Sequence, residues 1–97
     1  GNEGAAAIQT MMDGFRSHPP KEIAGYNVLR VLDYQTGIDG LPKSNVLKYV
    51  FENGWFAVRP SGTEPKIKFY FGVSADDEDA AKSALCHIEQ YLNNLLA

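Results

Sequence analysis

Apolar residues near the start of the chain recur at the spacing of an α-helix, which places them on one face. The alanines that precede them favour helix, whereas Pro19-Pro20 cannot continue it. We therefore predict a helix over residues 5 to 16. The residues that share its apolar face are Ile8, Met11, Met12 and Phe15.

The middle of the chain changes to patterns that are typical of β-strands. A strand is predicted over residues 25 to 34, and the glycine- and proline-containing stretch 35 to 45 is predicted to be a loop. Asn53-Gly54 indicates a hairpin that joins strands over residues 46 to 51 and 55 to 59. The clearest alternation follows, with one face made of Ile67, Phe69, Phe71 and Val73 and the other of Lys66, Lys68 and Tyr70.

A second helix is predicted at the end of the chain. It begins near Ser74, with Ser74 and Asp77 as a capping box or with Asp76 as the cap. The acidic residues of its first turn are favoured there by the helix dipole, and we prefer that interpretation to a cation site. His87 is placed on an exposed flank of this helix. The predicted buried residues are Ala81, Ala84, Leu85, Ile88, Leu92, Leu95 and Leu96.

The order helix, four strands, helix predicts an α+β fold, with a four-stranded antiparallel sheet and two helices packed on one face. A length of 97 residues fits a single domain over residues 1 to 97. No apolar run approaches the length needed to cross a membrane, and no signal-peptide pattern opens the chain. Cys86 has no partner for an internal disulfide. We interpret it as a partly buried helix residue in a protein of a reducing, cytoplasmic compartment.

The net charge of −3 limits the partners that fit the chain. The excess of acid lies in one cluster, residues 76 to 79, so the remaining chain is close to neutral. A nucleic-acid-binding protein normally carries a basic face with interleaved aromatic residues, and the sequence does not display one. The segment from Arg59 to Tyr70, with three basic residues and one acidic residue, is suited to a small anion.

One segment, Arg59-Pro60-Ser61-Gly62-Thr63-Glu64-Pro65, carries the groups that hold a phosphate. Arginine presents a planar fork of donors that can meet two phosphate oxygens. Hydroxyls donate further hydrogen bonds, and glycine lets backbone N–H groups approach the anion. The alternative is a turn that only joins two strands, because these residue types are also common in turns. A strand that aims Arg59 and two prolines that restrict the loop favour the phosphate site.

The same segment resembles the phosphate-binding loop in the C-terminal domain of the phosphohexomutases, the phosphoglucomutase and phosphomannomutase superfamily. The resemblance runs from about Leu41 to Val73 and includes Leu41-Pro42-Lys43-Ser44-Asn45-Val46-Leu47 and Asn53-Gly54-Trp55. It implies the fold of the last domain of these enzymes, which is like that of the TATA-box-binding protein. It also implies that residues 1 to 20 are a helix and a linker that continue from a preceding domain.

The resemblance further implies a function. Enzymes of this family move a phosphoryl group between the 1- and 6-positions of a hexose phosphate, using a phosphoserine and a Mg²⁺ ion in another domain. The resemblance implies that this chain holds the phosphate of the substrate that is not transferred. The residues that would hold it are Arg59, Ser61, Gly62 and Thr63. The implied partners are glucose or mannose phosphate and the other three domains, with no nucleic acid and no membrane.

The chain departs from the family in lacking a phosphoserine loop, an Asp-x-Asp-x-Asp metal loop and a glutamate-bearing sugar loop. No catalytic residue and no metal ligand is therefore assigned to it, and we expect it to be inactive alone. The second hypothesis is a stand-alone interaction or nucleic-acid-binding module, which the acidic charge disfavours. His18 is predicted to be a surface residue, Trp55 and Tyr70 are interpreted as sheet residues, and Lys66 as a solvated strand residue.

Overall fold

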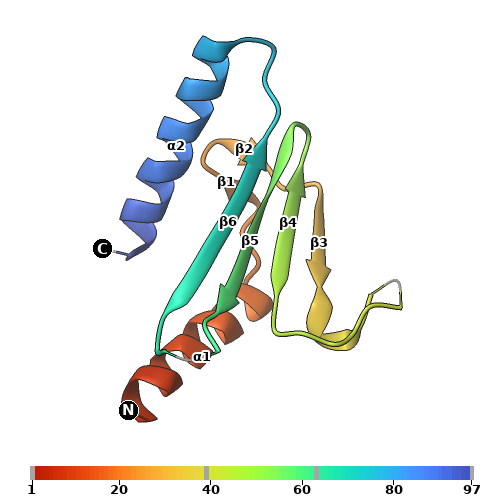
Figure 1. Ribbon diagram of the computed structural model, residues 1–97, viewed down its shortest axis with the longest axis vertical. Helices are drawn as coiled ribbons and strands as arrows, with labels where there is room; N and C mark the ends of the chain where they lie inside the picture. Colours follow the sequence, from red (N-terminus) through yellow and green to blue (C-terminus); the bar gives the residue numbers. More distant parts are fainter. Residues whose placement is uncertain (1, 39, 63, 97) are drawn as a thin grey trace.

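In the computed structural model, a four-stranded antiparallel sheet is combined with two helices and a small hairpin (Figure 1). The structure describes residues 2–38, 40–62 and 64–96. The helices are α1 (Asn2–Ser17) and α2 (Glu78–Leu96). The strands are β1 (Glu22–Ile23), β2 (Tyr26–Asn27), β3 (Arg30–Asp33), β4 (Leu47–Phe51), β5 (Gly54–Pro60) and β6 (Ile67–Val73). The predicted α+β class is confirmed.

The main sheet has the order β3-β4-β5-β6, and each strand is antiparallel to the next. Its register aligns apolar residues across strands. Tyr49 pairs with Phe56, which in turn pairs with Phe71. Because side chains alternate between the two faces of a sheet, this register gathers the large apolar groups on one face.

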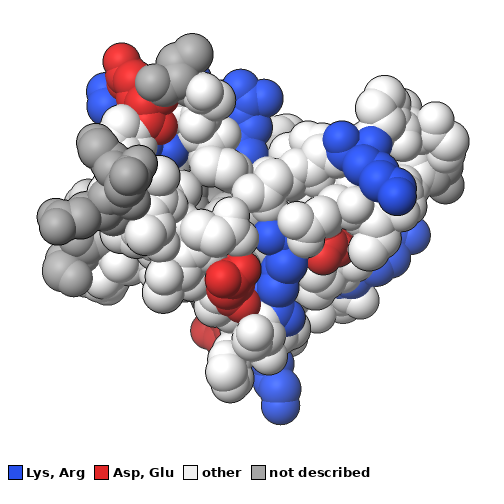
Figure 2. Space-filling model, turned by 90° about the horizontal axis from the view of Figure 1, so that it is seen from below, with Lys and Arg blue, Asp and Glu red and all other residues white. Residues whose placement is uncertain are grey.

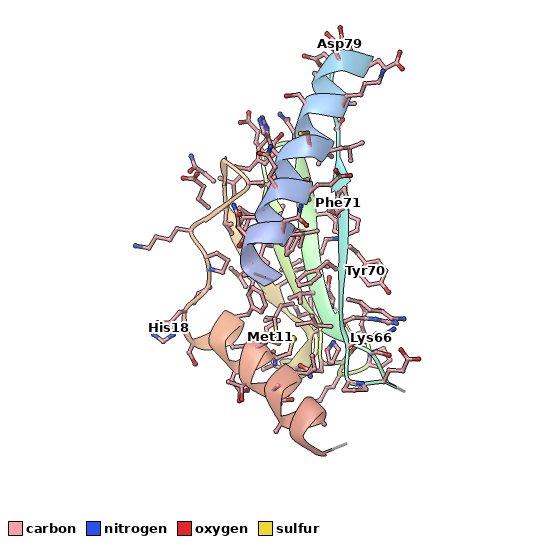
Figure 3. All side chains as sticks on the ribbon, turned by 90° about the vertical axis from the view of Figure 1, so that its left-hand side faces the viewer. Met11, His18, Lys66, Tyr70, Phe71 and Asp79 are labelled. Carbon is pink, nitrogen blue, oxygen red and sulfur yellow. The ribbon has the colours of Figure 1, made fainter. Side chains whose placement is uncertain are left out.

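That face is covered by α1, α2 and the β1–β2 hairpin, which lie on the same side of the sheet (Figures 1 and 3). Tyr91 of α2 meets Phe56 edge-to-face, with ring centres 5.9 Å apart. Tyr26 of the hairpin stacks on Phe51 at 4.8 Å. The residues buried in this core are Met12, Ile23, Leu47, Tyr49, Phe51, Phe56 and Val58.

No helix or hairpin of the described residues lies over the opposite face of the sheet, here called the open face. Figure 3 shows Tyr70 on the side of β6 that points away from α2. The register arranges the open face in three cross-strand rows. These rows are Arg30–Val50–Trp55–Gly72, Leu32–Lys48–Ala57–Tyr70 and Arg59–Lys68. The predicted division of β6 into an apolar face and a face with Lys68 and Tyr70 is confirmed.

The strand region predicted over residues 25 to 34 is divided between two sheets, and the chain reverses at its start. Its first part pairs as β2 with β1, a strand that the sequence pattern did not reveal. The reversal occurs at Ala24 and Gly25, whose φ values are 53° and 86°. β3 starts only at Arg30, and a short 3₁₀ turn at Tyr34–Thr36 follows it. A two-residue strand has too few positions to give a periodic signal.

The hairpin between β4 and β5 is confirmed, but Gly54 has a different role from the one predicted. The loop residues are Glu52 and Asn53, and Gly54 already pairs with Phe51 inside the sheet. A Cβ on Gly54 would collide with the carbonyl oxygen of Gly72. Close approach of β6, and not a left-handed turn, therefore requires glycine at this position.

The start and the buried face of α2 also differ from the prediction. Asp77 caps the helix, since its Oδ1 accepts a hydrogen bond from the Ala80 N–H at 2.7 Å, while the Ser74 N–H donates to the Asn53 carbonyl. Ala84 and Ile88 are buried as expected, but Leu85 is 43% exposed and Cys86 is exposed. Tyr91 continues the stripe of Ala84 and Ile88, and this direction turns Leu85 outward. Only the backbone of Leu96 is described.

A charged pair joins α1 to the edge strand β3. The Arg16 Nε donates to Asp33 Oδ2 at 3.1 Å, and the Gln35 N–H donates to Asp33 Oδ1 at 3.0 Å. Burial alone would raise the pKa of Asp33, but the hydrogen bonds from Arg16 and Gln35 and the charge of Arg16 lower it below 3.8. A lowered pKa means that the ionised carboxylate stabilises the folded state.

The free energy of unfolding should therefore fall as the pH is lowered through the folded-state pKa of Asp33, below 3.8. At pH 7 this contribution is fully present. Asp33→Asn should reduce stability at pH 7 and flatten its dependence on pH below 4. Urea unfolding of both proteins between pH 2.5 and 7 tests this, with Asp13→Asn, at an exposed position on α1, as the matched control. Equal slopes for all three proteins would contradict the assigned pair.

Candidate functional site

The segment singled out in the sequence forms the loop between β5 and β6. Pro60 and Ile67 close it as the last paired residues of the two strands. Two backbone hydrogen bonds hold it, from the Ser61 N–H to the Lys66 carbonyl and from the Lys66 N–H to the Glu64 carbonyl, both 2.8 Å. Gly62 is exposed, and Thr63 lies outside the described residues.

Helix α1 supports this loop from below. A Cβ on Gly4 would lie 2.7 Å from the Cβ of Pro65, so helix and loop are in direct contact. Between them is a hollow of about 370 Å³, lined by Ala5, Ile8, Gln9, Pro60, Ser61, Gly62, Glu64 and Pro65. A loop that is pinned by two hydrogen bonds and a helix is preorganised, which reduces the ordering cost when a ligand binds.

Arg59 lies at the end of β5 on the open face, where its guanidinium stands over the Tyr70 ring, 5.6 Å from the ring centre. The residue is exposed. Within residues 2–38, 40–62 and 64–96, no carboxylate forms a salt bridge with it. The fork of donors is therefore turned toward solvent and available to an anion.

Lys68 pairs directly with Arg59 in the register of β5 and β6. Like charges that face each other across a sheet destabilise it, and in the described part of the chain no carboxylate pairs with either cation. A bound anion would remove this repulsion. The alternation along the sequence places Lys68 on the polar face of its strand, but its position opposite Arg59 depends on the register of β5 and β6, which the sequence does not reveal.

Two residues of this loop have partners within it. The backbone N–H of Ser61 is used within the loop by the Lys66 carbonyl. Lys66 makes an exposed ion pair with Glu64, with 3.0 Å between Nζ and Oε2. The solvated role predicted for Lys66 agrees with this pair. Seen from the end of the molecule that carries α1 and the loop, basic side chains predominate over scattered acidic ones (Figure 2).

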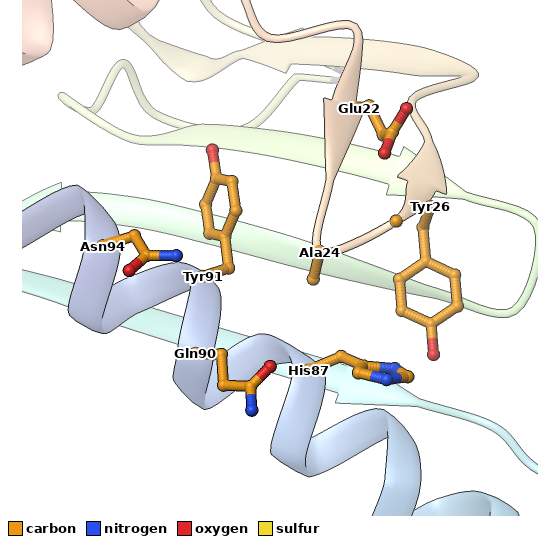
Figure 4. Close-up of a pocket in the computed structure, with 8 residues that line it drawn as sticks. Glu22, Ala24, Tyr26, His87, Gln90, Tyr91 and Asn94 are labelled. Carbon is orange, nitrogen blue, oxygen red and sulfur yellow. The ribbon is translucent and has the colours of Figure 1, made fainter.

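A second hollow, of about 640 Å³, lies between the β1–β2 hairpin and α2 (Figure 4). Glu22 and Tyr26 line it from the hairpin, and His87, Gln90 and Asn94 from the helix. His87 is exposed, as predicted. The hollow is on the helix-covered side of the sheet, so it does not share a surface with Arg59. It has no hydrogen-bonded acid–base pair among the described residues and carries no recognisable chemistry.

Neither a metal centre nor a membrane span is found in the described part of the chain. No three His, Cys, Asp or Glu side chains there come together as metal ligands, the acidic start of α2 included. No described helix is both long and apolar enough to cross a bilayer.

Comparison with known proteins gives consistent matches. The model of the phosphoglucomutase/phosphomannomutase C-terminal domain matches residues 9–85. A phosphoglucomutase of Staphylococcus saprophyticus is 37% identical over 99% of this chain, and one of Staphylococcus aureus is 44% identical over 81% of it. The chain spans 19% and 16% of the length of these two relatives. The chain therefore belongs to the phosphoglucomutase/phosphomannomutase family and corresponds to its C-terminal domain.

Proposed function

We propose that this chain holds the phosphate group of a hexose phosphate within a larger phosphoglucomutase-type enzyme. Arg59, Ser61, Gly62 and Thr63 would hold the phosphate that is not transferred, and Lys68 would supply a second positive charge. The observation that carries this proposal is the exposed pair Arg59–Lys68, which lies beside the loop without a described carboxylate partner.

A grip that contacts only phosphate fits a mutase, because the sugar must be held in two orientations. Charge-assisted hydrogen bonds contribute about 1.5–3 kcal/mol each. In the complete enzyme this binding free energy would draw the domain over the cleft and exclude water while phosphate moves between the 1- and 6-positions of the sugar. In the isolated domain, ordering costs would leave an affinity of about millimolar.

The chemical step would belong to the remainder of the polypeptide. The Mg²⁺ ion and the phosphoserine would be supplied by other domains of the enzyme. The chain alone would be inactive, and the whole enzyme would act in the cytoplasm. The alternative function is that of a stand-alone nucleic-acid-binding module. The basic residues of the open face favour this alternative, whereas the net charge of −3 disfavours it.

A titration of the isotope-labelled chain separates the two functions. Glucose 1-phosphate should shift amide signals of residues 59 to 68 and leave the hollow around His87 unchanged. Inorganic phosphate should reproduce the shifts and glucose should not, since the charge is what is recognised. Shifts of equal size with glucose would refute the phosphate grip. A broad response to single-stranded DNA that collapses with salt would favour the alternative function.

A further inference from the structure

Positive charge is gathered on the open face, although the chain as a whole has a net charge of −3. Arg30, Lys48, Arg59 and Lys68 occupy positions in the three rows of this face, and no Asp or Glu occupies one. None of these cations forms a salt bridge with a described carboxylate. The acidic start of α2 lies at the far end of the molecule, where Figure 3 places Asp79 opposite Lys66.

Two aromatic rings are interleaved with these cations. The Lys48 Nζ stands 4.8 Å from the centre of the Trp55 ring, and Arg59 stands over Tyr70. A Cβ on Gly72 would lie 2.7 Å from the Trp55 Nε1, so the indole rests flat across β6 where glycine leaves room. In each cation–ring pair the two residues come from different strands. For this reason the sequence did not reveal that basic and aromatic residues alternate on this face. The result is a cationic surface that includes two aromatic rings.

We propose that the open face docks on an acidic protein surface, the part of the enzyme that lies opposite the phosphate loop. This inference rests on the proposed function. Rows two residues apart along a strand are about 6.6 Å apart, so the three rows span about 13 Å along the strands. Arg30 on β3 is also two strands away from Arg59 on β5, which adds about 10 Å across the sheet. A partner that presents a sugar phosphate to Arg59 approaches the same face of the sheet that carries this patch. The relatives are more than five times as long as this chain, so they carry the additional polypeptide that such a surface requires.

The geometry favours a carboxylate-bearing protein over a nucleic acid. Bases bind by stacking on free aromatic faces, and here Lys48 and Arg59 already occupy ring faces of Trp55 and Tyr70. A long polyanion would also extend beyond the patch toward Glu64 and the acidic start of α2. A protein surface can instead match the patch alone, pairing its carboxylates with these cations.

Charge reversal within the patch tests the proposal. Arg30→Glu/Lys48→Glu is compared with Lys21→Glu/Lys82→Glu, which changes the net charge equally at exposed sites outside the open face. The probes are poly-L-glutamate, single-stranded DNA and inorganic phosphate, and the readout is the amide shifts together with the fluorescence of Trp55, the single tryptophan. The patch variant should bind poly-L-glutamate at least about tenfold more weakly, the control less than about twofold. Phosphate binding should be unchanged in both.

A second experiment uses a chimera in which this chain replaces the matching segment of the Staphylococcus saprophyticus phosphoglucomutase. The patch variant should lower kcat/KM there about tenfold, with the control unaffected. Equal poly-L-glutamate binding by both variants, or tighter binding of DNA than of poly-L-glutamate at equal salt, would overturn the docking proposal. Failure of phosphate to bind the unmodified chain would instead overturn the proposed function, so the two failures are distinguishable.

Discussion

Arg59→Ala in the chimera is expected to lower kcat/KM by about 100-fold or more, through a higher KM and a lower kcat. The substitution removes two charge-assisted hydrogen bonds to the phosphate, each worth about 1.5–3 kcal/mol, and every 1.4 kcal/mol is about a factor of ten. kcat should fall as well because phosphate binding is what closes the domain. Steady-state kinetics with glucose 1-phosphate measures both effects.

Two matched variants distinguish a specific grip from general positive potential. Arg59→Lys keeps the charge but loses the planar fork, so it should fall between wild type and Arg59→Ala. Lys66→Ala removes a nearby cation that is exposed and paired with Glu64, and it should change kcat/KM by less than about threefold. The fold should survive in all variants, since an exposed cation–π contact such as Arg59–Tyr70 is worth about 0.5–1 kcal/mol. Equal losses of kcat/KM in Arg59→Ala and Lys66→Ala would show that the general positive potential, and not specific hydrogen bonding by Arg59, binds the phosphate.

The loop could be predicted from sequence because its chemistry is local. Arg59, Ser61 and Gly62 stand within four positions of one another, so any strand–loop–strand arrangement brings them together. Lys68 could not be assigned to the site from the sequence, because its position opposite Arg59 is set by hydrogen bonds between two strands. The spacing of residues along the chain does not encode that register. The basic open face could not be predicted for the same reason, since its three rows combine residues of four strands.

Helices and strands, too, could be predicted where the sequence pattern is local and long. Helix α1 and strand β6 carry long, regular apolar patterns, and both appear where predicted. The errors fell on short or tertiary features: the two-residue strands β1 and β2, the cap of α2, and the exposed side of Leu85. Gly54 was predicted to matter for the hairpin turn, but the structure requires glycine there for another reason. A Cβ at this position would collide with the carbonyl oxygen of Gly72, on a strand further along the chain.

Phe56→Ala should have the largest effect on stability, a loss of about 3–5 kcal/mol in the free energy of unfolding. Phe56 is fully buried at the centre of the sheet and contacts Phe69 and Tyr91, with ring centres 5.6 and 5.9 Å away. Its removal leaves a cavity and also takes away a contact that holds α2 on the sheet. Hydrogen exchange should therefore show faster exchange in α2 than in β4 and β5.

Urea unfolding followed by circular dichroism measures the loss, with Leu29→Ala as control. Leu29 is 67% exposed, so its truncation should change stability by less than about 0.5 kcal/mol. Since domains of this size have only about 5–15 kcal/mol in total, Phe56→Leu provides a milder variant with an expected loss of about 1 kcal/mol. A loss for Phe56→Ala no larger than that for Leu29→Ala would contradict the burial of Phe56 between the sheet and α2.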